Sequence, residues 1–279
     1  MDCIAIDVGN SNIAVALFLE NKLDHVERLP ATEPKDLAER LTAMRAKAGE
    51  QPFGARTVPV IVSSVNPPAL SLVEQAIAKA LDQKALVIGR DVPVQFKHAV
   101  EHPERVGTDR FVTAAAAYSV IEDAVVVADF GSATTIDVVD HYGIFLGGVI
   151  LPGLAMSAHA LHEHTAQLPD VTPAAPTGDY PTNTQAAIEH GIYYGAIGAL
   201  RAIVERYATL LGRWPHVVLT GGFARLLAPD IDFADSFVPD LCLNGIFLAW
   251  KQHTATQEDA IKHDVTELDN LLGPDASQA

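Results

Sequence analysis

Two aspartates end apolar strands and are followed by turns of small and hydroxyl-bearing residues. Asp7 follows the run Ile4-Ala5-Ile6 and begins one such turn, and Asp129 follows residues 125–128 and begins a second. A carboxylate at such a place can hold a cation or its water, and small turn residues let backbone N–H groups and hydroxyls approach phosphate oxygens. One turn of this kind is more often plain turn chemistry. Two of them, at the starts of two similar halves, predict a nucleotide held between two related domains.

Three further positions have a structural interpretation, and two of them also have a chemical one. Asp109 and Arg110 stand in a Gly-Thr-Asp-Arg turn at an expected helix start. Asp109 is a candidate base, or a helix N-terminal carboxylate stabilised by the helix dipole beside a surface Arg. Thr184 stands at an expected helix start, where Thr is a common N-cap. Gly221-Gly222 either lets the backbone approach a nucleotide or allows tight helix packing.

These residues need a scaffold in which strands and helices alternate. Short apolar runs predict strands at residues 3–7, 13–19, 58–63, 85–88, 124–129, 134–139, 143–150 and 217–219. Helical periodicity predicts helices at residues 33–48, 67–81, 107–121, 153–164 and 184–211. In both halves two hairpin-linked strands precede alternating helices and strands, which indicates an internal structural repeat. The proline-rich residues 169–181 are expected to form a loop.

The last segment, residues 256–273, has apolar residues at helical spacing and ends at Gly273-Pro274. Thr256 with Asp259 resembles a capping box, so a separate amphipathic helix is expected to begin there. It could dock on its own chain or act as an interaction arm. The expected domains are residues 1–120 and 121–253, followed by this helix and tail at 254–279.

Composition favours an α/β protein and excludes some partners. The 279 residues are 49% hydrophobic and 6% aromatic, which suits apolar strands and a substantial core. The formal net charge is −16 without a basic stripe, so we expect no nucleic acid partner. An anionic substrate would need local Arg or Lys. Cys3 and Cys242 fit neither a zinc site nor a disulfide framework, and no signal peptide or membrane span is evident, so we expect a cytoplasmic protein without membrane contact.

An ordered series of motifs from residue 1 to about residue 250 resembles the type III pantothenate kinases of the actin-like ATPase superfamily. The element Gly107-Thr108-Asp109-Arg110 separates this family best from sugar kinases and actin relatives. The other elements are Asp7-Val8-Gly9-Asn10-Ser11-Asn12, Ser63-Ser64-Val65 with Pro67, the Asp129 turn through Thr135, Gly147-Gly148 with Pro152-Gly153, residues 165–169, Asn183-Thr184, Gly191 with Gly195, and Thr220-Gly221-Gly222. The resemblance implies an α/β fold of two duplicated ribonuclease-H-like domains with the nucleotide cleft between them.

The resemblance also implies an activity. Such enzymes transfer the γ-phosphate of ATP to the primary hydroxyl of pantothenate, the first step of coenzyme A synthesis. They use Mg²⁺ and a monovalent cation, K⁺ or NH₄⁺, and work as homodimers with the pantothenate pocket completed at the subunit interface. By this resemblance Asp109 accepts the hydroxyl proton, Asp7 holds Mg²⁺ through water, and Asp129 holds the monovalent cation. The implied substrate-binding residues are Gly107, Thr108, Asp109, Arg110, Thr184 and Val100. The implied ATP-binding residues are Asp7, Val8, Gly9, Asn10, Ser11, Asn12, Ile13, Ala14, Ser132, Gly221 and Gly222.

Two departures from the family pattern keep alternatives open. Ser132 stands where the family has an ATP-contacting Thr, which keeps the hydroxyl and loses a methyl group. Val100 stands where the family often carries a substrate-contacting Tyr, so a kinase for another small hydroxy compound is one alternative. A non-catalytic regulator on the same scaffold is another, although the intact acidic residues favour an enzyme. Asp129 could also be a second Mg²⁺-water ligand or a structural turn residue.

The helix expected at residues 184–211 carries small residues at three- and four-residue spacing, among them Gly191 and Gly195. Such a face lets another helix approach closely. Tyr193 and Tyr194 would add area of the kind that interfaces favour. The pattern predicts a homodimer contact on this helix, although part of the face must pack on the chain's own sheet.

Overall fold

The computed structural model describes residues 1–32, 36–49 and 58–272, and its strands form two sheets. The first sheet has the order β3-β2-β1-β4-β5, and the second has the order β11-β10-β7-β8-β9-β6. The strands of the first sheet are β1 (Cys3–Val8), β2 (Asn12–Leu19), β3 (Lys22–Pro30), β4 (Val60–Ser64) and β5 (Leu86–Val87). Those of the second are β6 (Lys97–His98), β7 (Val125–Phe130), β8 (Ala133–Val139), β9 (Ile144–Pro152), β10 (His216–Thr220) and β11 (Ser236–Phe237).

The two sheets repeat one arrangement of strands. β1 pairs antiparallel with β2 and parallel with β4, and β7 pairs antiparallel with β8 and parallel with β10. Asp7 has Ser63 as its neighbour on the parallel strand, and Asp129 has Thr220 in the same relation. The predicted internal repeat and the α/β fold are therefore confirmed. The two aspartates occupy equivalent places in the two sheets.

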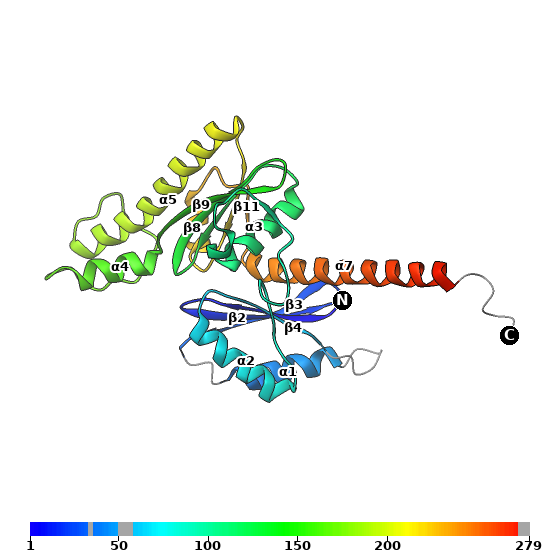
Figure 1. Ribbon diagram of the computed structural model, residues 1–279. Coiled ribbons are helices and arrows are strands. Elements are labelled where there is room, and N and C mark those ends of the chain that lie inside the picture. The colour runs from blue at the N-terminus through cyan, green and yellow to red at the C-terminus, as the bar shows by residue number, and fades with distance from the viewer. Residues whose placement is uncertain (33–35, 50–57, 273–279) are drawn as a thin grey trace.

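Helices and sheets alternate in layers (Figure 1). The helices are α1 (Leu37–Gly49), α2 (Pro67–Leu81), α3 (Thr108–Ile121), α4 (Leu154–Glu163), α5 (Thr184–Leu211), α6 (Ala224–Leu227) and α7 (Leu241–Leu272), with single turns η1 (Pro103–Arg105) and η2 (Ala228–Asp230). α1 and α2 cover the outer face of the first sheet, and α5 covers the outer face of the second. α3 and α7 pack between the sheets. This middle layer lies beside both aspartates.

The predicted elements agree with the structure to within two residues at each end, except for the first and the last helix, and the elements β3, β6, β11, α6, η1 and η2 were not predicted. The expected start of the first helix at residue 33 lies outside the described residues. β3 was not predicted, because five of its nine residues are charged or His and break the apolar pattern. The separate terminal helix was wrong, since α7 is continuous from Leu241 and Thr256 lies in its interior, where its hydroxyl donates to the Gln252 carbonyl at 3.0 Å. The apolar face expected at residues 261–272 lies outside the residues whose side chains are described.

α7 begins earlier than the sequence pattern indicated because its first turns are buried. Leu243, Ile246 and Phe247 pack against the first sheet, where the ring of Phe247 stacks on that of Phe18 at 4.5 Å between centroids. Helices gain most of their stability from such packing. The buried apolar turns therefore begin the helix at Leu241. The more polar residues that follow continue the same helix beyond the two sheets (Figure 1).

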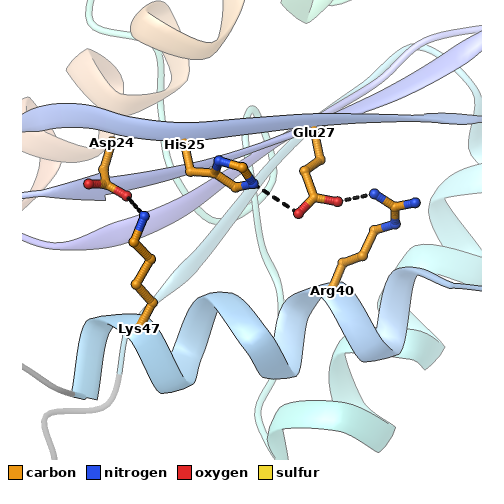
Figure 2. A network of polar contacts seen from close by, with 5 residues as sticks. All are labelled: Asp24, His25, Glu27, Arg40 and Lys47. Atoms are coloured by element: carbon orange, nitrogen blue, oxygen red, sulfur yellow. Dashed lines mark hydrogen bonds and ion pairs between the residues drawn. The ribbon is translucent and has the colours of Figure 1, made fainter.

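β3 is held to α1 by ion pairs on the outer face of the first sheet. Figure 2 shows Glu27 pointing toward Arg40 of α1 and Asp24 pointing toward Lys47. The Nε2 of His25 also lies 3.0 Å from a carboxylate oxygen of Glu27. Successive residues of a strand face opposite sides of the sheet. Arg28, the residue after Glu27, therefore faces the inner side of the sheet, toward the second half of the chain.

One face of α5 packs in the core of its own chain, and another face, which carries Gly191, Gly195 and Gly198, is open. Its buried residues include Ile188, Tyr193 and Ile197. The Tyr193 hydroxyl donates to Asp230 at 2.9 Å, so the expectation that Tyr193 adds interface area was wrong. Added Cβ atoms at Gly191, Gly195 and Gly198 would meet nothing within 4 Å, and Tyr194 is 53% exposed.

Candidate active site

A cavity of about 520 Å³ lies between the two halves and gathers most of the residues predicted to do chemistry. The predicted residues that line it are Asp7, Gly9, Asn10, Asn12, Ala14, Asp109, Arg110, Asp129, Ser132, Gly221 and Gly222. Both sheets, α3 and the start of α7 contribute to the wall. The fold thus brings together segments that lie more than two hundred residues apart in the sequence.

The carboxyl groups of Asp7 and Asp129 have strongly raised pKa values in this cavity. Burial raises the pKa of Asp7 from 3.8 to about 7, helped by Asp109 and Asp129 and opposed by a hydrogen bond from the Cys242 thiol. Burial likewise raises the pKa of Asp129 to about 7, helped by Asp109 and Asp137. Several carboxylates that share one low-dielectric space disfavour one another's ionised forms. A bound cation relieves that repulsion.

The turn after Asp7 meets the turn after Asp129 directly. The hydroxyl oxygens of Ser11 and Ser132 lie 2.6 Å apart, and either can donate the hydrogen bond. The Gly9 N–H donates to the Asn12 carbonyl at 3.0 Å and holds the first turn closed. The two turns therefore present hydroxyl and backbone groups to the same part of the cavity.

Among the other predicted ATP-binding residues, Val8 and Ile13 have fully buried side chains in the first core. These two residues can offer only backbone groups to a nucleotide. Gly221 has φ of +93°, and a Cβ there would clash with the Asp129 carboxylate and the Phe130 backbone. Close contact with the end of β7, rather than the expected helix packing, therefore requires this glycine, which also lines the cavity. Gly222 has open space around it and lines the cavity.

Asp109 is the second residue of α3 and faces the cavity. One of its carboxylate oxygens accepts the Arg110 backbone N–H at 2.8 Å, so it also serves the helix start. A Cβ at Gly107 would clash with the same carboxylate, and the neighbouring Thr108 hydroxyl lies 2.9 Å from that of Ser63. Burial raises the pKa of Asp109, against hydrogen bonding and attraction from Arg110. A carboxylate with a raised pKa accepts a proton more readily.

Arg110 forms a buried ion pair with Asp137 of β8, which sequence reasoning missed. The Arg110 Nε lies 3.0 and 3.1 Å from the two carboxylate oxygens, and Nη2 contacts one of them. Their side chains are only 14% and 4% exposed. A Cβ at Gly148, on the neighbouring strand, would clash with Asp137. The available signal was an acidic residue inside the apolar run Ile136–Val139.

Four predicted substrate residues do not line this cavity: Gly107 and Thr108, which adjoin Asp109, and Val100 and Thr184, which lie elsewhere in the fold. Val100 packs in an apolar cluster near Gly147. Thr184 lies at the start of α5 and lines a second, largely apolar cavity of about 770 Å³. It is not the N-cap, because the Asn183 side chain accepts the Ala186 N–H at 2.9 Å. Within one chain, Thr184 is therefore not brought to Asp109.

Sequence reasoning also missed wall residues that come from distant segments. Arg28 of β3 and Asp240, just before α7, form an ion pair and both line the cavity. Cys242 lines it too, and burial raises the pKa of its thiol well above the ordinary value. Arg225 of α6 is exposed at the wall, and no ion pair involves it in the described part of the chain. Only the fold brings these residues to the site.

The donor set of the cavity fits hard cations. Carboxylate oxygens of Asp7 and Asp129 and hydroxyls of the two turns are oxygen ligands, which Mg²⁺ and alkali cations prefer. Among residues 1–32, 36–49 and 58–272, no cluster of three or more His, Cys, Asp or Glu side chains is arranged to hold a metal. Mg²⁺ commonly uses one or two carboxylates together with waters and substrate phosphates.

Residues 1–32, 36–49 and 58–272 contain no helix that is long and apolar enough to cross a membrane.

Solved structures share this fold. The activator of the 2-hydroxyisocaproyl-CoA dehydratase from Clostridium difficile, solved with bound ADPNP, superposes with a TM-score of 0.52 at 14% identity, over 93% of this chain and 98% of that one. A protein from Campylobacter jejuni described as a Baf family transcriptional activator gives a TM-score of 0.54 at 22% identity, over 90% of this chain and 99% of that one. At these identities the likeness concerns the fold alone.

Sequence relatives are closer. The type III pantothenate kinase of Dehalococcoides mccartyi is 33% identical over 90% of this chain and 98% of its own length. That of Brevibacillus brevis is 35% identical over 90% of this chain and 98% of its own length. The family model for type III pantothenate kinase matches residues 3–206. The chain therefore belongs to the type III pantothenate kinase family.

Proposed function

We propose that this enzyme transfers the γ-phosphate of ATP to the primary hydroxyl of pantothenate, giving 4′-phosphopantothenate for coenzyme A synthesis. Family membership supplies the reaction. The observation that carries the residue assignment is the convergence of Asp7, Asp109, Asp129 and Arg110 on one cavity. Phosphoryl transfer depends on positioning and on charge neutralisation, and these groups offer both.

Asp109 orients the pantothenate hydroxyl and takes its proton. Its carboxylate faces the cavity with one oxygen engaged by the Arg110 N–H, which fixes its direction. Its raised pKa makes it a better proton acceptor than an exposed aspartate. In a loose phosphoryl-transfer transition state the proton leaves late, so orientation of the hydroxyl is the larger part of the role.

The two strand-end aspartates hold the cations. Asp7 holds Mg²⁺ through water, and Asp129 holds the monovalent cation. Mg²⁺, when bound, neutralises charge on the phosphates. The raised pKa values of both carboxyls support this assignment, because each is costly to ionise without a positive partner.

The turn Gly9–Asn12 and the side chain of Ser132 bind the phosphates, and Gly222 leaves space for the nucleoside. The contact between Ser11 and Ser132 supports a phosphate chain held from both sides. Gly222 has open space on the cavity wall, which suits a close approach by the adenine or ribose. Ser132 keeps the hydroxyl of the family's Thr.

Arg110 binds the polar end of pantothenate. Asp137 engages its Nε and Nη2, which fixes the guanidinium plane and leaves Nη1 for substrate. Val100 packs in an apolar cluster. At the position where the family often has Tyr, this chain therefore has a smaller apolar side chain that does not line the cavity of its own chain.

The enzyme acts as a homodimer through the open face of α5. Gly191 and Gly195 line the second, apolar cavity together with Thr184. An added Cβ at either glycine would meet nothing of the same chain, which supports approach by a second helix. Thr184 would then complete the partner's pantothenate pocket. A cytoplasmic location stays a prediction from the cysteine usage.

Identification of the product tests this function. We expect the purified protein, given ATP, Mg²⁺, K⁺ and pantothenate, to form a phosphate monoester on the primary hydroxyl, seen by ³¹P NMR and mass spectrometry. Hydrolysis of ATP without a phosphorylated pantothenate would refute the proposal.

A further inference from the structure

Arg28 lies in one row with Asp7 across the first sheet. Ala14 of β2 is the register partner of Asp7 on one side and of Arg28 on the other. Directly opposed residues on neighbouring antiparallel strands point to the same face of a sheet. All three residues line the 520 Å³ cavity, which agrees with that geometry. Neighbouring strands are about 4.8 Å apart, so the backbones of Arg28 and Asp7 lie about 10 Å apart.

This row of the first sheet contains a positively charged residue, and the equivalent row of the second sheet does not. There Asp129 is followed by Thr135 of β8 and Ile150 of β9. The repeat therefore places Arg28 and Ile150 at equivalent positions. Because one sheet carries a guanidinium there and the other a hydrocarbon chain, the repeated fold itself does not require the arginine.

Arg28 is more exposed than the carboxylate with which it pairs. It forms an ion pair with Asp240, whose side chain is 16% exposed, while that of Arg28 is 53% exposed. The pair joins the edge of the first sheet to the start of α7 at the cavity wall. Arg110 is already engaged by Asp137 deep in the site, so Arg28 is a more accessible guanidinium on the same wall.

We propose that Arg28 is a binding residue for the nucleotide phosphates and that Asp240 competes with those phosphates for it. The inference rests on the proposed function, because the ligand is ATP. Guanidinium groups bind phosphate through charge-assisted hydrogen bonds in a bidentate geometry. The chain carries a net charge of −16, so an anionic nucleotide depends on such local positive groups. Asp240 lowers the affinity for the nucleotide because its carboxylate accepts from Nη2 of Arg28, one of the groups that phosphate would use.

A purely structural role for the Arg28–Asp240 ion pair predicts different changes in nucleotide affinity when either residue is replaced. As a clasp between β3 and α7, the pair would lose the same contact through either Arg28→Ala or Asp240→Asn, and both variants would change nucleotide affinity in the same direction. As competing groups, they would change it in opposite directions. Asp240→Asn keeps the shape of the side chain and removes its charge, which frees Arg28 for phosphate.

Calorimetric titrations with a non-hydrolysable ATP analogue and with adenosine separate these roles. The variants are Arg28→Ala, Arg28→Lys and Asp240→Asn, in Mg²⁺ and K⁺ at low ionic strength. Arg90→Ala is the matched control, since Arg90 is also 53% exposed and ion-paired, with Glu74, but does not line the cavity. We expect Arg28→Ala to raise Kd for the ATP analogue on the order of tenfold, as for loss of a charged hydrogen bond, with Arg28→Lys intermediate. Asp240→Asn should lower that Kd several-fold, and adenosine affinity should not change.

Each outcome decides between the possibilities. Equal Kd values for Arg28→Ala and Arg90→Ala would overturn the inference and leave the proposed function intact. A loss of affinity in both Arg28→Ala and Asp240→Asn would assign the pair to a structural clasp. A loss that is equally large for adenosine would show that Arg28 does not act on phosphate. If the wild-type protein binds no ATP analogue at all, the proposed function itself fails.

Discussion

The hydroxyl oxygens of Ser11 and Ser132 lie 2.6 Å apart, although 121 residues separate them in the sequence. Ser11 belongs to the turn after Asp7, and Ser132 to the turn after Asp129. Two turns that resemble each other in sequence therefore meet at one cavity. A phosphate chain at this point is reached by hydroxyls and backbone N–H groups from both halves of the chain.

Replacement of Asp109 tests the assignment of the base. Asp109→Asn keeps the shape of the side chain and removes its charge, so kcat should fall on the order of 10²-fold or more, as for the removal of a general base. Steady-state kinetics and a circular dichroism spectrum check the loss and the fold. Asp232→Asn is the control, since Asp232 is 82% exposed and does not line the cavity. Near-normal turnover in a folded Asp109→Asn variant would remove Asp109 from the mechanism.

Activity should depend on a monovalent cation. Asp129 is a buried carboxylate that is costly to ionise alone, and K⁺ or NH₄⁺ would compensate it. Initial rates should be low in buffers that contain only Na⁺ or Tris and should recover as KCl is added at constant ionic strength. Equal rates with and without K⁺ or NH₄⁺ would exclude the cation role of Asp129.

The stability of the metal-free protein should depend on pH through Asp129. Its pKa rises from 3.8 to about 7 on folding, so the folded state binds this proton more tightly than the unfolded state. Its contribution is therefore full below about pH 4 and is lost as the pH rises toward 7. The Asp129→Asn variant has no carboxyl group at this position and therefore does not lose this contribution. The free energy of unfolding of the variant minus that of the wild type should thus rise by up to about 4 kcal/mol between pH 4 and pH 8.

Urea denaturation with EDTA in a Tris buffer measures that difference. Addition of K⁺ at pH 8 should stabilise the wild type and leave Asp129→Asn unchanged. A difference between the two proteins that stays constant from pH 4 to pH 8 would mean that Asp129 ionises in the folded state as it does in the unfolded chain.

A large side chain on the open face of α5 should separate the subunits. Gly195→Trp places an indole where a partner helix would approach, so sedimentation should show monomers, and pantothenate binding should weaken because Thr184 begins the same helix. Gly49→Trp is the control, since residue 49 also has open space around it but ends α1. A fully active wild-type monomer at assay concentration would contradict the link between assembly and the pocket.

The strand-end aspartates were predictable because their signal is local. An apolar strand, an Asp and a turn of small residues lie within a few positions at Asp7 and again at Asp129, and the strand registers confirm that the two places are equivalent. The repeat of strands followed from the same patterns. Local sequence was also sufficient for most helices, because their apolar spacing reflects one buried face.

The rest of the cavity wall was not predictable, because it depends on contacts between distant segments. Asp137 stands in an apolar strand, and only the fold shows that Arg110 satisfies it. Arg28 lies on an edge strand too polar to be recognised, and Asp240 precedes a helix whose beginning was missed. Position along the sequence does not show that these two residues meet.

A coupled assay of ADP release with a panel of alcohols tests the central claim most directly. With ATP, Mg²⁺ and K⁺, we expect ADP release to require pantothenate, with a kcat/KM well above that for other small hydroxy compounds, and to be lost in Asp109→Asn. Preference for a different alcohol would mean that this site, with Val100 in place of Tyr, serves another substrate. Nucleotide binding without ADP release for any alcohol would contradict the assignment of this chain as a kinase.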